Sequence, residues 1–198
     1  MVMNNVFSEF SALMHTRLSA PIHNTTEDSI RYTFFAALLK RANVQPHEIA
    51  LEYPHPAVAG KIVDTYIPSL DGKPVVIEFK YDRNIPSGRA GRKTHNAGAL
   101  FADIYRLYKF EASESDRLLV YCTDQIMAKY FRKPANDYSV FFDLVQGQTM
   151  SIDDKFMSTK PDTVKKRIGG AMNVVLECLW TDNLPQEHYL RIYGVLPQ

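Results

Sequence analysis

GKIVDTYIPSLDGKPVVIEFKYDR, residues 60–83, contains two apolar runs that are separated by a turn signal. The runs Lys61–Ile67 and Val75–Tyr81 are rich in β-branched and aromatic residues, which favour strands. The segment Pro68–Gly72 between them combines proline, serine, aspartate and glycine, as turns do. These residues therefore predict a β-hairpin.

Charged residues interrupt both of these apolar strands. Because side chains alternate between the two faces of a strand, Glu78 and Lys80 share one face, while Ile77 and Phe79 point to the other. The hairpin brings Asp64 beside Glu78. We therefore expect two carboxylates and one ammonium group on one surface of the sheet.

Such charges are costly in an apolar strand unless something compensates them. Lys80 can neutralise one acid, and we expect its partner to be Glu78. Two adjacent carboxylates repel each other, and one tends to stay protonated unless a cation joins them. Mg²⁺ meets that need, since it binds one or two carboxylates together with waters and substrate phosphate. The pattern predicts a site for a hard divalent cation.

The residues on either side of the hairpin predict a series of helices and strands. Before the hairpin, we expect a helix over residues 5–19, a helix that begins after a cap at Thr25 or Thr26 and ends before Pro46, and a strand over Ile49–Tyr53. After it, we expect helices over Thr94–Phe110, Asp124–Phe131 and Val164–Trp180, and strands over Leu118–Cys122, Ser139–Leu144 and Tyr189–Val195.

This order of elements predicts an α/β fold, in which helices flank a mixed sheet. The strand–helix–strand step from Val75 to Cys122 predicts a parallel pair of strands. The length of 198 residues favours a single domain over residues 1–198. We expect its core to span about residues 25–145, with the helix 5–19 and the helix and strand of residues 163–195 as additions.

The element order helix, three strands, helix, strand over residues 27–122 resembles the core of the PD-(D/E)xK nuclease superfamily, which has the restriction-endonuclease-like fold. Asp64 and the triplet Glu78-Phe79-Lys80 match the motif of this family, and they lie fourteen positions apart from first acid to second. The match departs from the motif at Val63, which stands where the family name has proline.

The resemblance implies a set of catalytic residues. Asp64, Glu78 and the backbone carbonyl of Phe79 would bind Mg²⁺, for which Mn²⁺ can substitute. Lys80 would orient or activate the attacking water. Glu27 matches the extra acid that many members carry on the helix before the first strand, and it would assist through water or a second ion. An ordinary interpretation of Glu27 stays open, because an acid in the first helical turn complements the helix dipole and Arg31 can pair with it.

A basic stretch follows the Glu78–Lys80 strand directly. Residues 80–93 carry five basic side chains against Asp82, a local charge of +4 in a chain of total +1. We expect this stretch to bind the phosphates of nucleic acid. The predicted contacts are Arg83, Arg89, Arg92, Lys93 and His95. The alternative for the stretch is a solvated loop, and the alternatives for His95 are a second base or a helix start without such a role.

Two further polar groups are interpreted as surface features. Asp103 and Arg106 form an ordinary polar face of the predicted helix Thr94–Phe110, although Arg106 can reach nucleic acid. Lys165–Arg167 is typical of a solvated turn.

Composition and motifs exclude several classes of protein. A net charge of +1 excludes a histone-like polycation, and 45% hydrophobic residues exclude a mostly disordered chain. No apolar run approaches the ~20 residues of a membrane span, and no signal peptide is evident, so we expect a soluble cytoplasmic protein without membrane contact. The six histidines form no HxxxH pair, Cys122 and Cys178 are core residues, and nucleotide-binding P-loops and GxSxG elbows are absent.

The sequence therefore predicts a magnesium-dependent endonuclease, a hydrolase of phosphodiester bonds with DNA as its expected substrate, in restriction, phage defence or repair. A homodimer fits this activity, because two strands need two active sites. The alternatives are a DNA-binding or interaction protein that keeps the nuclease fold without catalysis, and a different enzyme class on the same fold.

Overall fold

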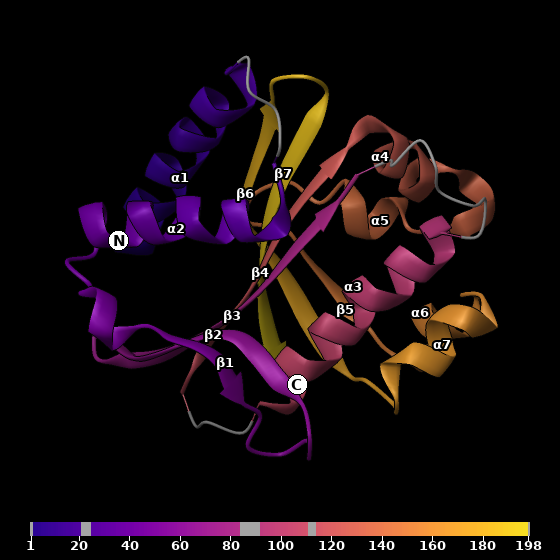
Figure 1. The fold of residues 1–198 in the computed structure, drawn as a ribbon. Helices are drawn as coiled ribbons and strands as arrows, with labels where there is room; N and C mark the ends of the chain where they lie inside the picture. Colours follow the sequence, from indigo (N-terminus) through magenta and orange to yellow (C-terminus); the bar gives the residue numbers. More distant parts are fainter. Residues whose placement is uncertain (1, 21–24, 84–91, 111–113, 198) are drawn as a thin grey trace.

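The computed structural model describes residues 2–20, 25–83, 92–110 and 114–197. Within these ranges the chain forms a seven-stranded mixed sheet with the order β1-β2-β3-β4-β7-β6-β5 (Figure 1). Its strands are β1 (Ala50–Pro54), β2 (Ile62–Leu70), β3 (Lys73–Asp82), β4 (Asp116–Asp124), β5 (Thr149–Ile152), β6 (Val174–Leu184) and β7 (His188–Pro197). Only β3 and β4 run parallel among these neighbouring pairs.

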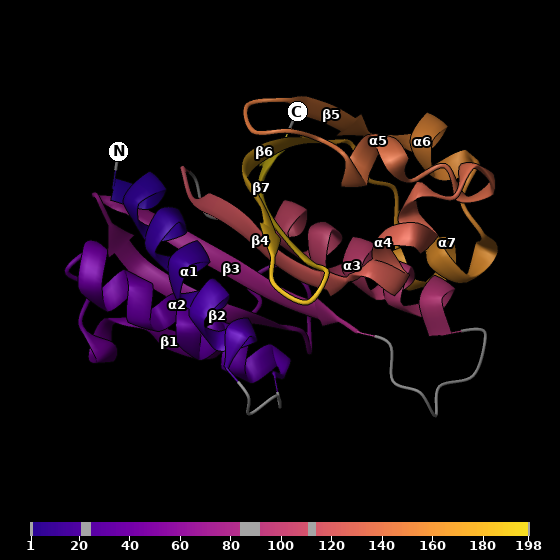
Figure 2. The same cartoon turned by 90° about the horizontal axis from the view of Figure 1, so that it is seen from above.

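Helices cover both faces of this sheet. They are α1 (Val2–Ser19), α2 (Glu27–Arg41), α3 (Arg92–Lys109), α4 (Gln125–Arg132), α5 (Ser139–Phe142), α6 (Asp154–Ser158) and α7 (Asp162–Ile168), with short 3-10 turns at Pro46–Glu48 and Pro134–Asn136. Helices α1 and α2 lie on one side, and α3 lies with α4 to α7 on the other, as Figure 2 shows from above. None of the helices in the described ranges is both long and apolar enough to cross a membrane.

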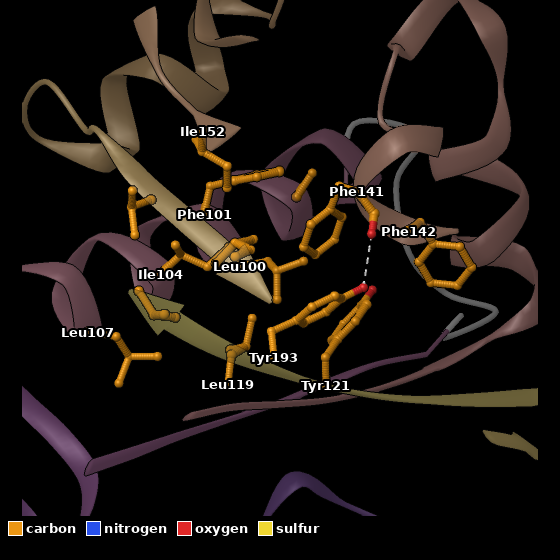
Figure 3. Close-up of a cluster of buried hydrophobic side chains, with 14 of the residues drawn as sticks. Leu100, Phe101, Ile104, Leu107, Leu119, Tyr121, Phe141, Phe142, Ile152 and Tyr193 are labelled. Atoms are coloured by element: carbon orange, nitrogen blue, oxygen red, sulfur yellow. Dashed lines mark hydrogen bonds between the residues drawn. The ribbon is translucent and has the colours of Figure 1, made fainter. Parts of the chain in front are cut away.

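The apolar core has two layers, one on each face of the sheet. Ile77 and Phe79 of β3 pack with α1 and α2, whereas Val76 packs with α3. Figure 3 shows part of the second layer. Buried side chains of α3 meet those of β4, α5 and β7 there, and the Tyr193 hydroxyl donates a hydrogen bond to the backbone oxygen of Phe141 at 3.1 Å.

The predicted hairpin is confirmed, with longer strands than expected. Leu70 pairs with Lys73 across a two-residue turn, and both turn residues have positive φ, 52° at Asp71 and 81° at Gly72. An Asp-Gly pair suits such a turn, because its twist matches that of the strands. The predicted parallel pair is also confirmed, since β3 runs alongside β4 from Val75 to Asp82.

The predicted strand over residues 139–144 is wrong, because this segment contains the one-turn helix α5. Phe141 and Phe142 are adjacent and both fully buried. Neighbouring side chains of a strand point to opposite faces, whereas a helical turn directs both rings toward the same cluster around Phe131.

The predicted helix over residues 164–180 is wrong beyond its first turns. Helix α7 ends at Ile168, where Gly169 takes a positive φ of 84°. From Val174 to Cys178 buried and partly exposed residues alternate, which is the period of a strand. These residues belong to β6, and β7 beside it pairs with β4, so the C-terminal hairpin extends the sheet.

Candidate active site

The strands β2 and β3 separate at one end. Their pairing includes Thr65 opposite Ile77, although β2 begins at Ile62 and β3 continues to Asp82. We call the separated segments, residues 62–64 and 78–82, the fork. Beyond this point β3 keeps its other neighbour, β4, as far as Asp82. Among the described residues, one edge of β3 is therefore without a partner strand at the fork.

Two carboxylates occupy this edge. Asp64 Oδ2 accepts a hydrogen bond from the Phe79 N–H at 2.8 Å, and Glu27 Oε2 accepts one from the Tyr81 N–H at 3.0 Å. Glu27 reaches this position because it begins α2, whose start is fixed by a capping box at Thr26. The side-chain oxygens thus replace the carbonyl groups that a neighbouring strand would offer.

Glu78 lies deeper in the same region. Its side chain is 1% exposed, and it receives two hydrogen bonds from Arg106, one from Nε at 2.8 Å and one from Nη2 at 3.1 Å. Arg106 Nη2 also donates to Asp103 Oδ1 at 2.8 Å. One guanidinium group therefore neutralises part of the charge of two buried acids.

Negative charge still exceeds positive charge around the fork. Burial raises the pKa of Glu78 well above its ordinary value, and the charges of Asp64 and Asp103 raise it further against the opposing effect of Arg106. Burial likewise raises the pKa of Asp103 to about 7 and that of Asp82 to about 6. Acids in such an environment keep their proton to a higher pH than ordinary carboxyl groups do, unless a cation takes its place.

Lys80 binds Glu27 rather than the expected Glu78. Its Nζ lies 3.2 Å from Glu27 Oε2. Burial lowers the pKa of Lys80, but the charges of Asp103, Glu27 and Asp82 outweigh burial, and the pKa is raised overall. The ammonium group therefore stays charged, which suits the orientation of a water or the stabilisation of developing charge better than the abstraction of a proton.

Arg31 takes a different partner from the one that its spacing suggests. Its Nη2 group donates to Asp64 Oδ1 at 3.2 Å, and its Nη1 group lies 3.9 Å from Asp28. The side chain of Arg31 is 12% exposed, and that of Asp64 is 19% exposed. Arg31 thus links α2 to the first acid of the fork, and Glu27 remains with Lys80.

The predicted contacts to nucleic acid are only partly described. Arg89 lies outside the described residues, and Arg92 begins α3. Arg83 follows β3 directly and is exposed, as is Lys93. His95 is exposed too, but its Nδ1 atom and its backbone oxygen both contact Arg167 Nη1, at 3.1 and 2.9 Å.

The interpretation of Asp103 and Arg106 as an ordinary polar helix face is wrong. Both contribute to the surroundings of Glu78, and Asp103 is 5% exposed while the side chain of Arg106 is 25% exposed. A signal was present, because Asp103 follows Leu100 by three residues and precedes Leu107 by four, which places it on the buried stripe of α3.

The fork contains ligands of the type that a hard divalent cation prefers. Asp64 and Glu78 lie next to the paired residues Thr65 and Ile77 on the two strands, and the charge of Asp64 raises the pKa of Glu78. The carbonyl of Phe79 points to the same side as its N–H, toward Asp64, because both groups of a strand residue face one neighbour. In the described part of the chain no three His, Cys, Asp or Glu side chains cluster as metal ligands, and this set has two carboxylates. The donor types and the excess negative charge fit Mg²⁺ or Mn²⁺.

Comparison with known proteins gives no match for this chain, whether with protein-family models, with curated proteins or with solved structures.

Proposed function

We propose that this protein is a magnesium-dependent nuclease with the restriction-endonuclease-like fold, which hydrolyses phosphodiester bonds in DNA. The observation that carries the proposal is the meeting of Asp64, Glu78, Lys80 and Glu27 at the fork, from α2 and from two strands. Asp64, Glu78 and Lys80 belong to the motif, and Glu27 matches the extra acid on the preceding helix. The element order from α2 to β4 and the parallel pair of β3 and β4 also support it.

Each residue has a role that follows from its position. Asp64, Glu78 and the Phe79 carbonyl would hold the cation, which when bound would polarise a phosphoryl oxygen and lower the pKa of a water. Lys80, kept charged by its acidic neighbours, orients the water and stabilises charge on the phosphoryl group. Glu27 fixes the Lys80 ammonium group at 3.2 Å. Arg106 fixes the carboxylate of Glu78.

A non-catalytic nucleic-acid-binding protein is the second candidate. One observation favours it, because both oxygens of Glu78 accept hydrogen bonds from Arg106. In that case the guanidinium group of Arg106 would neutralise Glu78 permanently and no cation would bind. Catalysis requires that Glu78 keep an electron pair for the metal, which a carboxylate has, since each oxygen can accept two bonds.

The test is cleavage of plasmid, linear and single-stranded DNA and of RNA, each with Mg²⁺, Mn²⁺ or EDTA. We expect cleavage of DNA with either metal and none in EDTA. Asp64→Asn keeps an oxygen for the Phe79 N–H but removes a charge, and cleavage should fall a thousandfold or more, which corresponds to about 4 kcal/mol of transition-state stabilisation.

Asp28→Asn is the matched control, because Asp28 lies on the same helix as Glu27 and its side chain is 69% exposed. This variant should cleave like the wild type. Melting curves in EDTA verify that every variant is folded. The proposal fails if no substrate is cleaved with either metal, or if folded Asp64→Asn cleaves DNA at the wild-type rate.

A further inference from the structure

A cavity of about 540 Å³ opens beside the acidic cluster, on the side of α3 that faces α7. Its lining includes Asp103 and Arg106, so it is continuous with the residues that hold Glu78. Lys61, just before the fork, and Arg167, at the end of α7, supply two more cations to the wall. The wall of the cavity therefore carries three basic side chains and one acid, Asp103, which is hydrogen-bonded to Arg106.

The packing of α7 against α3 places Arg167 at this wall. Gly98 allows the close approach, since a Cβ atom there would lie 3.1 Å from Arg167 Cδ and 3.3 Å from Val164 Cα. The Nη1 group of Arg167 then donates to His95, at the backbone oxygen and at Nδ1. The guanidinium group is thus held at Nη1 while the side chain lines the cavity.

Lys61 and Arg167 carry charges that no acid in the described ranges neutralises. Both are exposed, and neither forms an ion pair with any residue in those ranges. Two such cations at the wall of one cavity repel each other and favour an anion between them. Arginine guanidinium and lysine ammonium groups commonly bind phosphate in nucleic-acid complexes.

We propose that this cavity binds a backbone phosphate of the DNA substrate, next to the phosphate that is cleaved at the fork, with Lys61 and Arg167 as its ligands. The inference rests on the proposed function, because it assigns a further part of the same substrate. His95 acts here as a positioning residue that holds Arg167. The contact is to phosphate, so it contributes affinity for every DNA sequence and sets the register of the strand in the site.

The experiment measures the binding of a fluorescent duplex oligonucleotide in EDTA, at several salt concentrations, so that cleavage does not interfere. Lys61→Ala and Arg167→Ala should each weaken binding about tenfold, as the loss of one charge-assisted hydrogen bond does. Each should flatten the dependence of log K on log salt by about 0.9. Lys166→Ala is the control, because Lys166 is an exposed cation on the same helix that does not line the cavity.

The binding data decide whether Lys61 and Arg167 contact a phosphate of DNA. Weaker binding and a flatter slope in both variants, with Lys166→Ala unchanged, support it. Wild-type affinity and slope in folded Lys61→Ala and Arg167→Ala overturn it, as does equal weakening in Lys166→Ala or a wild type that does not bind DNA. Metal-dependent cleavage by the wild type is measured separately. Its failure overturns the nuclease, while the binding slopes still test the phosphate contact.

Discussion

Replacement of Asp103 by asparagine should make the protein more stable than the wild type, increasingly so from pH 5 to pH 8. Asp103 is buried beside Glu78 and Arg106, and its pKa is raised from an ordinary 3.8 to about 7. The asparagine side chain would keep an oxygen for the bond from Arg106 Nη2, now 2.8 Å long, but it would carry no charge. The variant therefore removes the titration and preserves the hydrogen bond.

The direction in which stability changes with pH follows from the number of protons that the folded and unfolded states bind. Above pH 4 the unfolded chain has released the proton of Asp103, whereas the folded protein keeps it up to about pH 7. The folded state binds more protons in this window, so the free energy of unfolding of the wild type falls as pH rises. Each pH unit contributes about 1.4 kcal/mol, and the stability gap between variant and wild type should widen by about 2–3 kcal/mol from pH 5 to pH 8.

Urea unfolding of both proteins in EDTA at pH 5, 6, 7 and 8 measures this gap. Subtracting the free energy of unfolding of the wild type from that of the variant removes the contribution of groups that titrate identically in the two proteins. Asp71→Asn, in the exposed turn between β2 and β3, is the control for the loss of a carboxylate at the surface. If the stability gap between Asp103→Asn and the wild type stays flat or narrows toward pH 8, the pKa of Asp103 is not raised by burial and by its acidic neighbours.

Two further predictions concern packing and the thiols. Gly98→Val should push α7 away from α3 and lower the free energy of unfolding by about 1–3 kcal/mol in urea titrations, and unchanged stability would contradict the close contact between the two helices. Burial raises the pKa of Cys122 to about 12 and that of Cys178 to about 11, so native protein should react with a disulfide reagent at neutral pH far more slowly than protein in denaturant, and equal rates would show that the thiols are accessible.

The central elements of the fold could be predicted because their signals are local. The Asp71-Gly72 turn and the alternation of apolar and charged residues from Ile77 to Asp82 in β3 are visible within short stretches of sequence. The segments around Phe141 and Val174 could not be assigned in the same way. Their state depends on distant partners, since Phe141 stacks on Tyr193 and β6 pairs with β7. Apolar residues alone fit a helix or a strand in such cases.

The acids of the fork could be predicted as a group because a hairpin fixes which residues oppose each other. The cations could not be assigned to partners. Arg106 is three residues from Asp103, a spacing that suits an exposed ion pair on a helix as well as a buried one. Only the packing of α3 over β3 directs both side chains toward Glu78. The contact between Lys80 and Glu27 joins residues that are fifty-three positions apart.

The carboxylates at the fork make two backbone amides responsive to chemistry. The N–H groups of Phe79 and Tyr81 bind ionisable side chains, Asp64 and Glu27, where a strand would have offered carbonyls that never titrate. Protonation of either acid, or its engagement by a cation, changes the charge that the amide proton faces. In a ¹⁵N-labelled sample, the resonances of these two amides therefore serve as separate built-in indicators of events at the first acid of the fork and at the start of α2.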